Sequence, residues 1–299
     1  MKKFLLESLA FLFVISICFF LFWKLICVNR EQSLKFPNNE NIVFLGNSHV
    51  AYAVSDFIVK NSINFARVAE TTEFIYCKTK LLKQYNPQLD TIVIGYDNVI
   101  CFQSADSAFD SSHNSPYFYD VHNIRDINSI LKKSSYKHIE SYISHPFSWI
   151  KLYLIKEAYL KPNVNAKDLR NLGGYAYVDK TILNEIDINK SRNVDLKRGN
   201  KSFDTLSIYF LDETIKFCQE NGITVIFLCP PQHNKCRLDN TYYKDYYQKK
   251  YSNIKFYDFK DMHLPDSCFF DINHLNYSGA KVFSEYLEKE VFHKNNYPQ

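Results

Sequence analysis

The chain has 299 residues, and its 36 lysines and arginines against 32 aspartates and glutamates give a formal net charge of +4. At 46% hydrophobic and 23% charged, its composition excludes collagen-like, disordered and coiled-coil proteins. The basic excess lies in the first 30 residues, so the rest of the chain is close to neutral. A near-neutral body lacks the concentrated basic face that nucleic-acid-binding proteins need, and we expect no nucleic acid as a partner.

The N-terminus is a long apolar segment. No charged residue occurs from Ser8 to Trp23, and two lysines precede this stretch. As a helix, about 20–25 such residues span a bilayer core of about 30 Å. We interpret residues 1–30 as an uncleaved transmembrane anchor; the alternatives are a cleaved signal peptide, which the absence of a small-residue cleavage site disfavours, and a buried core helix. A short basic head favours a cytosolic N-terminus, with the body on the extracytoplasmic (periplasmic or extracellular) side.

Residues 31–40 are polar, and we interpret them as a linker to a body at 41–299. Short apolar runs, typical of buried parallel strands, alternate there with amphipathic helical segments. The predicted strands are 42–45, 63–66, 91–94, 223–228 and 254–257. The predicted helices are 69–85, 204–220 with Asp204 as N-cap and Gly222 after its end, and 278–291 with Val282, Phe283, Tyr286, Leu287 and Val291 buried. This alternation predicts an α/β fold with a parallel sheet covered by helices on both faces.

Residues 102–200 interrupt the alternation, and we interpret them as an insertion packed over one end of the sheet. Helices are predicted at about 124–143 and 147–160. The insertion is rich in aromatic residues, including Tyr117, Phe118, Tyr119, Trp149 and Tyr153. These side chains either form the core of the insertion, which we favour, or line a substrate site or rest on the membrane.

The eight cysteines show no C-x-x-C pair and no spacing typical of metal ligands. We therefore expect no metal site and no cofactor. Cys229 and Cys236 flank a short proline-containing segment. They form either a disulfide outside the cytosol or, as we favour, isolated thiols.

Two segments carry residues suited to acyl chemistry. The first predicted strand ends in Gly46-Asn47-Ser48-His49, and in open α/β sheets ligands bind at the carboxyl ends of the strands. Far downstream, Asp271 precedes His274 by three residues, a spacing that lets the carboxylate fix the imidazole tautomer while Nε2 takes a proton from a serine. Each segment alone is weak, because a serine after a strand is commonly a helix cap and Asp-x-x-His is common by chance.

Taken together, the two segments resemble the SGNH (GDSL-like) hydrolase superfamily, whose first block is Gly-Asp-Ser and whose last block is Asp-x-x-His. The run Asp271-Ile-Asn-His-Leu-Asn-Tyr-Ser-Gly-Ala280 is similar to that of membrane-anchored members linked to cell-surface polysaccharides, including relatives of the alginate O-acetyltransferases and the D-alanyl-teichoic acid transfer proteins. The resemblance covers roughly 41–101 and 203–292. It implies a three-layer α/β/α flavodoxin-like fold, with Ser48 as nucleophile, His274 as general base and acid, and Asp271 as the residue that orients it.

The resemblance also implies an oxyanion hole, formed by the Ser48 amide and by groups from the second and third blocks. The second block normally supplies a glycine amide, whereas this chain has no glycine from 47 to 94, which leaves the amide of Ala66 or Arg67. The third block is normally Gly-x-Asn-Asp, whereas here Gly95 is followed by Tyr96, Asp97 and Asn98. Asn98 serves as the donor if it points inward, and an ionised Asp97 in that position repels the oxyanion.

Two further positions flank the nucleophile. Asn47 replaces the family's aspartate before Ser48, at the substrate-binding end of the first strand. His49 follows Ser48, and we expect local capping or packing there rather than substrate contact.

These features predict a membrane-anchored serine esterase or O-acyltransferase, with acetyl the expected acyl group. Its expected partners are an acylated extracytoplasmic glycan or an acyl donor. The alternative is a catalytically weak SGNH-like component that binds glycan or a membrane-bound acyltransferase. A third possibility is an α/β domain with unrelated chemistry.

Overall fold

The computed structural model describes residues 2–98, 125, 126, 128, 132, 174–181, 204–235 and 242–292. Apart from four of its residues, the predicted helix at 124–143 lies outside this part of the chain. The predicted helix at 147–160, the insertion aromatics named above and Cys236 also lie outside it. Among the described residues, Cys18, Cys77, Cys218, Cys229 and Cys268 are free thiols.

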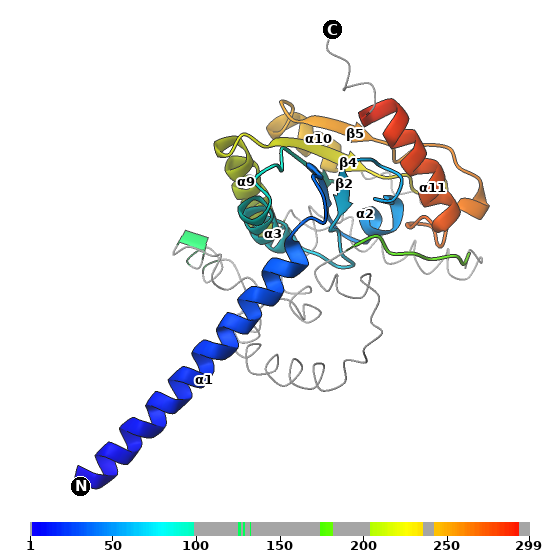
Figure 1. Ribbon diagram of the computed structural model, residues 1–299. Helices are drawn as coiled ribbons and strands as arrows, with labels where there is room; N and C mark the ends of the chain where they lie inside the picture. Colours follow the sequence, from blue (N-terminus) through cyan, green and yellow to red (C-terminus); the bar gives the residue numbers. More distant parts are fainter. Residues whose placement is uncertain are drawn as a thin grey trace.

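A parallel five-stranded sheet forms the centre of the body (Figure 1). Its strands are β1 (Ile42–Leu45), β2 (Ser62–Asn64), β3 (Thr91–Gly95), β4 (Thr224–Cys229) and β5 (Lys255–Asp258). Their spatial order is β2-β1-β3-β4-β5, and every neighbouring pair is parallel. The predicted α/β class and parallel sheet are therefore confirmed. Because all strands run the same way, their carboxyl ends share one edge of the sheet.

Helices cover both faces of the sheet (Figure 1). Side chains alternate across each strand, so Val43 and Leu45 face one core cluster while Phe44 faces the other. The first cluster holds side chains of α3 (Thr72–Tyr85), α9 (Thr205–Glu220) and α10 (Tyr242–Lys250). The second holds side chains of α2 (Ser48–Ala53) and α11 (Tyr277–Tyr286), which continues as a π-helical turn, η3 (Leu287–Phe292).

Helix ends largely follow their sequence signals. The Asp204 carboxylate accepts a hydrogen bond from the Ser207 amide, as expected of an N-cap. Gly222 follows α9 with φ +66°, a left-handed conformation that glycine adopts without steric cost. Helix α10 was not predicted, because its repeated tyrosines and lysines give little apolar periodicity.

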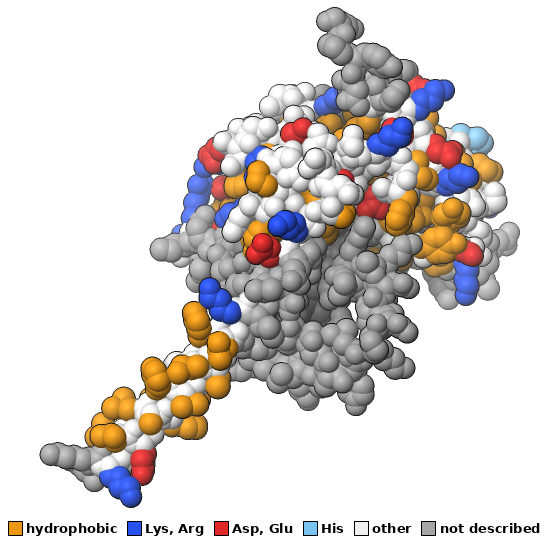
Figure 2. Space-filling view, in the orientation of Figure 1, with side chains coloured by type: hydrophobic (Ala, Val, Ile, Leu, Met, Phe, Trp, Pro, Cys, Tyr) orange, Lys and Arg blue, Asp and Glu red, His pale blue; other side chains and the backbone are white. Residues whose placement is uncertain are grey.

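The N-terminal helix α1 (Lys2–Leu34) projects from the body as a single rod (Figure 1). Its stretch Lys3–Leu21 is long and apolar enough to cross a membrane, and none of it is buried in the protein. Figure 2 shows hydrophobic side chains along this rod, with charged ones near its ends. The predicted linker at 31–40 is in part wrong, because the helix continues to Leu34. Leu34 is fully buried in the first cluster, and its carbonyl accepts a hydrogen bond from Asn86.

The last helix differs from its prediction on one face. Phe283, Leu287 and Val291 are buried as predicted, whereas Val282 and Tyr286 are 43% and 38% exposed. The apolar periodicity of this helix is wider than the stripe that contacts the sheet. Its predicted buried face was therefore too broad.

Gly279 lies in α11 where the helix meets η2, a 3-10 turn at Asp266–Cys268. A Cβ at this position would lie 2.1 Å from the Cys268 carbonyl oxygen, which is backbone and cannot rotate away. We expect Gly279→Ala to lower the free energy of unfolding by about 1–3 kcal/mol in urea titrations, as overpacked sites do. The exposed neighbour Ser278 supplies the control Ser278→Ala, and equal stability of both variants would contradict this close approach.

Candidate active site

The turn after β1 brings Ser48 to the carboxyl edge of the sheet. Gly46 has φ +145°, and a Cβ on it would come within 3.2 Å of Gly95, so the ends of β1 and β3 approach closely there. A Cβ on Gly95 would lie only 2.5 Å from Val50, a residue of α2. The two glycines thus let α2 lie directly over these strand ends. Ser48 is the first residue of α2 and is half-buried.

A short loop before α11 carries the other two predicted triad residues. Phe269 and Leu275 form an isolated antiparallel bridge, and the Phe270 amide donates to the His274 carbonyl oxygen. These bonds close a tight turn that presents Asp271 and His274 side by side. Asn276 ends the turn as the N-cap of α11, and its side chain accepts from the Gly279 amide.

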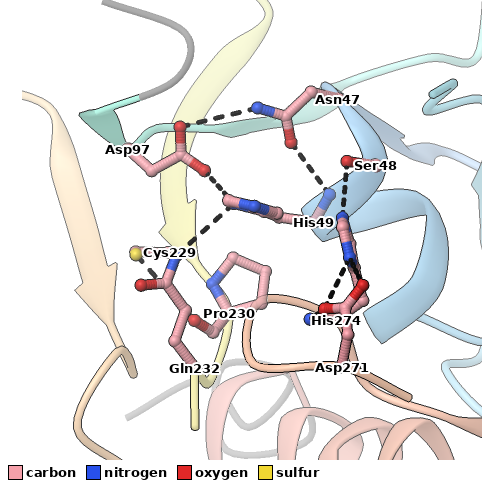
Figure 3. Close-up of polar contacts among 9 residues, drawn as sticks. All are labelled: Asn47, Ser48, His49, Asp97, Cys229, Pro230, Gln232, Asp271 and His274. Atoms are coloured by element: carbon pink, nitrogen blue, oxygen red, sulfur yellow. Dashed lines mark hydrogen bonds and ion pairs between the residues drawn. The ribbon is translucent and has the colours of Figure 1, made fainter. Parts of the chain in front are cut away.

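The structure brings Ser48, His274 and Asp271 together (Figure 3). The Ser48 Oγ to His274 Nε2 distance is 2.8 Å, and His274 Nδ1 lies 2.9 Å from each carboxylate oxygen of Asp271. Asp271 Oδ1 also accepts the amides of Asn273 and His274. Burial raises the pKa of Asp271, but the hydrogen bonds from His274 and these amides outweigh it and hold the pKa below its usual value. An ionised Asp271 therefore fixes a proton on His274 Nδ1 and leaves Nε2 to accept the serine proton.

A second histidine–carboxylate pair lies beside the first. His49 Nδ1 is 2.5 Å from Asp97 Oδ2, and the rings of His49 and His274 meet edge to face with centroids 5.2 Å apart. The other oxygen of Asp97 accepts a long hydrogen bond, 3.5 Å, from Asn47 Nδ2. Asn47, His49 and Asp97 are all buried, and Gln232 after β4 lies 3.5 Å from His49 Nδ1. In Figure 3, His49 extends from α2 toward Asp97 and Gln232.

The groups expected to bind the oxyanion are placed differently from the triad. The Ala66 amide donates to Asn64 Oδ1 at 2.9 Å, and the Arg67 amide donates to the Gly46 carbonyl at 2.9 Å. Both second-block amides are thus engaged within the protein. Asp97, from the third block, contacts the residues on either side of Ser48, and Asn98 follows it at a half-buried position.

Asn47 has a structural role in addition to its predicted place at the substrate-binding end of the first strand. Its side-chain oxygen accepts the His49 amide at 2.9 Å, so Asn47, and not Ser48, is the N-cap of α2. Its amide nitrogen faces Asp97. Both polar atoms of the Asn47 side chain therefore form hydrogen bonds that hold the turn carrying Ser48.

Part of the predicted insertion is attached to segments that adjoin the site. Residues 174–181 are hydrogen-bonded to the loop after β2, to α2 and to α11. The Gly174 amide donates to Ala66, the Ala176 amide donates to Ala51 of α2, and the Val178 carbonyl accepts the amide of Tyr277. These residues are thus held against α2 and α11, and the placement of the insertion over one end of the sheet stays a prediction.

Sequence reasoning missed the contact between His49 and Asp97 and the proximity of Gln232 and Tyr52. The Tyr52 ring lies 5.0 Å from that of His274 and stacks on Phe270. A signal existed for two of these residues, because Asp97 and Gln232 follow the carboxyl ends of neighbouring strands. Pairing between them and α2 could not be foreseen, since helix orientation over the sheet is a tertiary property.

A model of an uncharacterised family matches residues 179–296, a range that includes Asp271 and His274 but excludes Ser48. No curated protein matches the chain, and no solved structure matches it.

Proposed function

We propose that this protein is a membrane-anchored serine acyl-ester hydrolase or O-acyltransferase. The observation that carries the proposal is the hydrogen-bonded series Ser48–His274–Asp271, built from two segments more than 200 residues apart in the chain. Serine, a histidine with its Nε2 toward the hydroxyl and a carboxylate on Nδ1 are the parts of a nucleophilic acyl-transfer site.

In the proposed reaction, Ser48 Oγ attacks the acyl carbonyl carbon while its proton passes to His274 Nε2. The tetrahedral intermediate then collapses, the bond to the leaving alcohol breaks, and His274 returns the proton to that oxygen. Water or a sugar hydroxyl attacks the acyl-serine in the second half, with His274 again taking and returning a proton. Asp271 keeps the imidazole oriented throughout.

Two further features support a placement in the SGNH superfamily. The strand order 2-1-3-4-5 is that of flavodoxin-like sheets, and the two core clusters correspond to helical layers on either side of the sheet. The apolar helix α1 supports anchoring at a membrane. We propose that the body acts on the extracytoplasmic side, on an acetylated glycan, with a membrane-bound acyltransferase as the acyl source in the transfer reaction.

A fluorophosphonate probe tests this proposal, because it reacts far faster with an activated serine than with an ordinary one. We expect the full chain in detergent to be labelled, and the modified peptide to contain Ser48. Ser55, a buried serine just beyond the end of α2, supplies the control Ser55→Ala, which should keep the label. If a control serine esterase is labelled and this chain is not, the proposal fails, and the binding or assembly role becomes the better explanation.

A further inference from the structure

A buried carboxylate contacts the residues on both sides of the proposed nucleophile. Asp97, at the end of β3, accepts hydrogen bonds from Asn47 Nδ2 through Oδ1 and from His49 Nδ1 through Oδ2. It is 3% exposed, and Asn47 is 2% exposed. A group that bridges positions 47 and 49 restrains Ser48 between them.

The same contacts define the protonation of His49. A carboxyl group and an imidazole 2.5 Å apart share one proton, and because Asp97 also accepts from Asn47 as a carboxylate does, we assign this proton to His49 Nδ1. The ring so oriented packs edge to face against His274, and Tyr52 lies against His274 as well. His274 is therefore held by two rings, one of which is fixed by Asp97.

We propose that Asp97 and His49 are positioning residues for the acyl-transfer site: Asp97 fixes the Nδ1–H tautomer of His49, and the pair orients Ser48 and His274. This inference rests on the proposed function. The carboxylate also adds a negative charge near the imidazole that becomes positive when Ser48 transfers its proton. The pair should therefore act on turnover more than on substrate binding.

Donor and acceptor chemistry predicts a tautomer switch in Asp97→Asn. The single oxygen of the new amide is needed by Asn47 Nδ2, so its NH2 group faces His49 Nδ1 and moves the proton to Nε2. Exchanging both residues, in Asn47→Asp with Asp97→Asn, reverses this outcome. The acceptor-only Asp at 47 then takes the NH2 group, and the amide oxygen accepts from His49 Nδ1 again. An Asp at 47 also remains a good cap for α2.

The two strands offer a matched control at their other ends. Asn41 Nδ2 donates to Asp90 Oδ2 at 2.8 Å, directly before β1 and β3. The pair has the same residue types on the same strands, remote from Ser48. Asp90→Asn therefore makes the same residue change at an exposed Asn–Asp contact away from Ser48.

The experiment measures kcat and KM on p-nitrophenyl acetate, the midpoint of thermal unfolding, and the tautomer of His49 by 15N NMR. We expect Asp97→Asn to lower kcat by about 10–100-fold with KM within about 3-fold, as for residues that orient reactive groups. The double exchange should recover kcat to within about 5-fold of wild type and restore the Nδ1–H signal, whereas Asp90→Asn should leave kcat unchanged.

Wild-type kcat in Asp97→Asn would overturn the inference, as would a double exchange no more active than the single variant. If Asp97→Asn does not fold, His49→Phe replaces it: this variant keeps a ring against His274 but loses the Nδ1–H, and unchanged kcat there would also overturn the inference. If the proposed function is wrong, the result differs, because the wild type then lacks Ser48-dependent turnover. In that case the tautomer of His49 in Asp97→Asn alone shows whether Asp97 holds the proton on Nδ1.

Discussion

Ser48→Ala and His274→Ala should each lower kcat on an acyl ester by about 10⁴–10⁶-fold, and the double variant should be no slower than either single one. The two side chains act as one unit, because the serine is a weak nucleophile until its proton can pass to His274 Nε2, 2.8 Å away. Removing either partner removes the same step. Steady-state turnover of purified full-length protein, with the detergent blank subtracted, provides the measurement.

His263 supplies a matched control, because it is an exposed histidine in the loop between β5 and η2. His263→Ala should retain wild-type kcat. Additive losses in the double variant would contradict a shared step, and unchanged turnover in Ser48→Ala would exclude Ser48 as the nucleophile. Intact unfolding midpoints for all variants would show that the losses arise in the site.

Lys78→Met should destabilise the protein by about 3–5 kcal/mol, because it leaves a buried carboxylate without its cation. Lys78 is fully buried in α3, forms an ion pair with the buried Glu70, and donates to the Phe65 carbonyl at 2.8 Å. Phe65 directly follows β2, so the pair links α3 to the segment after that strand, and urea unfolding measures its contribution.

This pair also predicts a pH dependence. Burial raises the pKa of Glu70 to about 7, against the opposing effect of Lys78, whereas an unfolded glutamate titrates near 4.5. Between about pH 4.5 and 7 the folded state thus binds more protons than the unfolded state, and the free energy of unfolding falls as pH rises through this window. In Lys78→Met the opposing charge is absent, so the fall should extend to higher pH.

The control for this prediction is a surface pair. Lys216 and Glu220 lie 3.8 Å apart and exposed on α9, so Lys216→Met should change stability little. Glu70→Gln combined with Lys78→Met should recover at least half of the loss, because both charges of this buried pair are then removed. A loss in Lys78→Met no larger than that in Lys216→Met would contradict the role of the pair.

Much of the sheet could be predicted from local sequence. Runs such as Ile42–Leu45 and Thr91–Gly95 are apolar on both faces, which only strands buried between two helical layers require. Asp204 and Gly222 marked the ends of α9 because capping depends on a few adjacent residues. The exposed positions of Val282 and Tyr286 were not foreseen, since the width of a buried stripe depends on what packs against it.

The residues of the site also fall into those that local sequence identifies and those that only tertiary structure places. Ser48, Asp271 and His274 were identifiable because each follows a local rule: a serine after a strand and a glycine, and a carboxylate three residues before a histidine. The oxyanion groups were not identifiable. Whether the amides of Ala66 and Arg67 face a substrate depends on Asn64 and Gly46, whose positions follow from the parallel pairing of β1 with β2.

The sequence by itself determined an apolar N-terminal helix, a parallel α/β body and three of the residues that meet at its carboxyl edge. These features depend on hydrophobic periodicity and on chain-local spacing. Only the tertiary structure decided that Asp97 binds both His49 and Asn47, and that residues 174–181 are hydrogen-bonded to α2 and α11. Hydrogen bonds between strand ends and a helix 50 residues away depend on how closely the backbones approach, which Gly46 and Gly95 permit but no local pattern specifies.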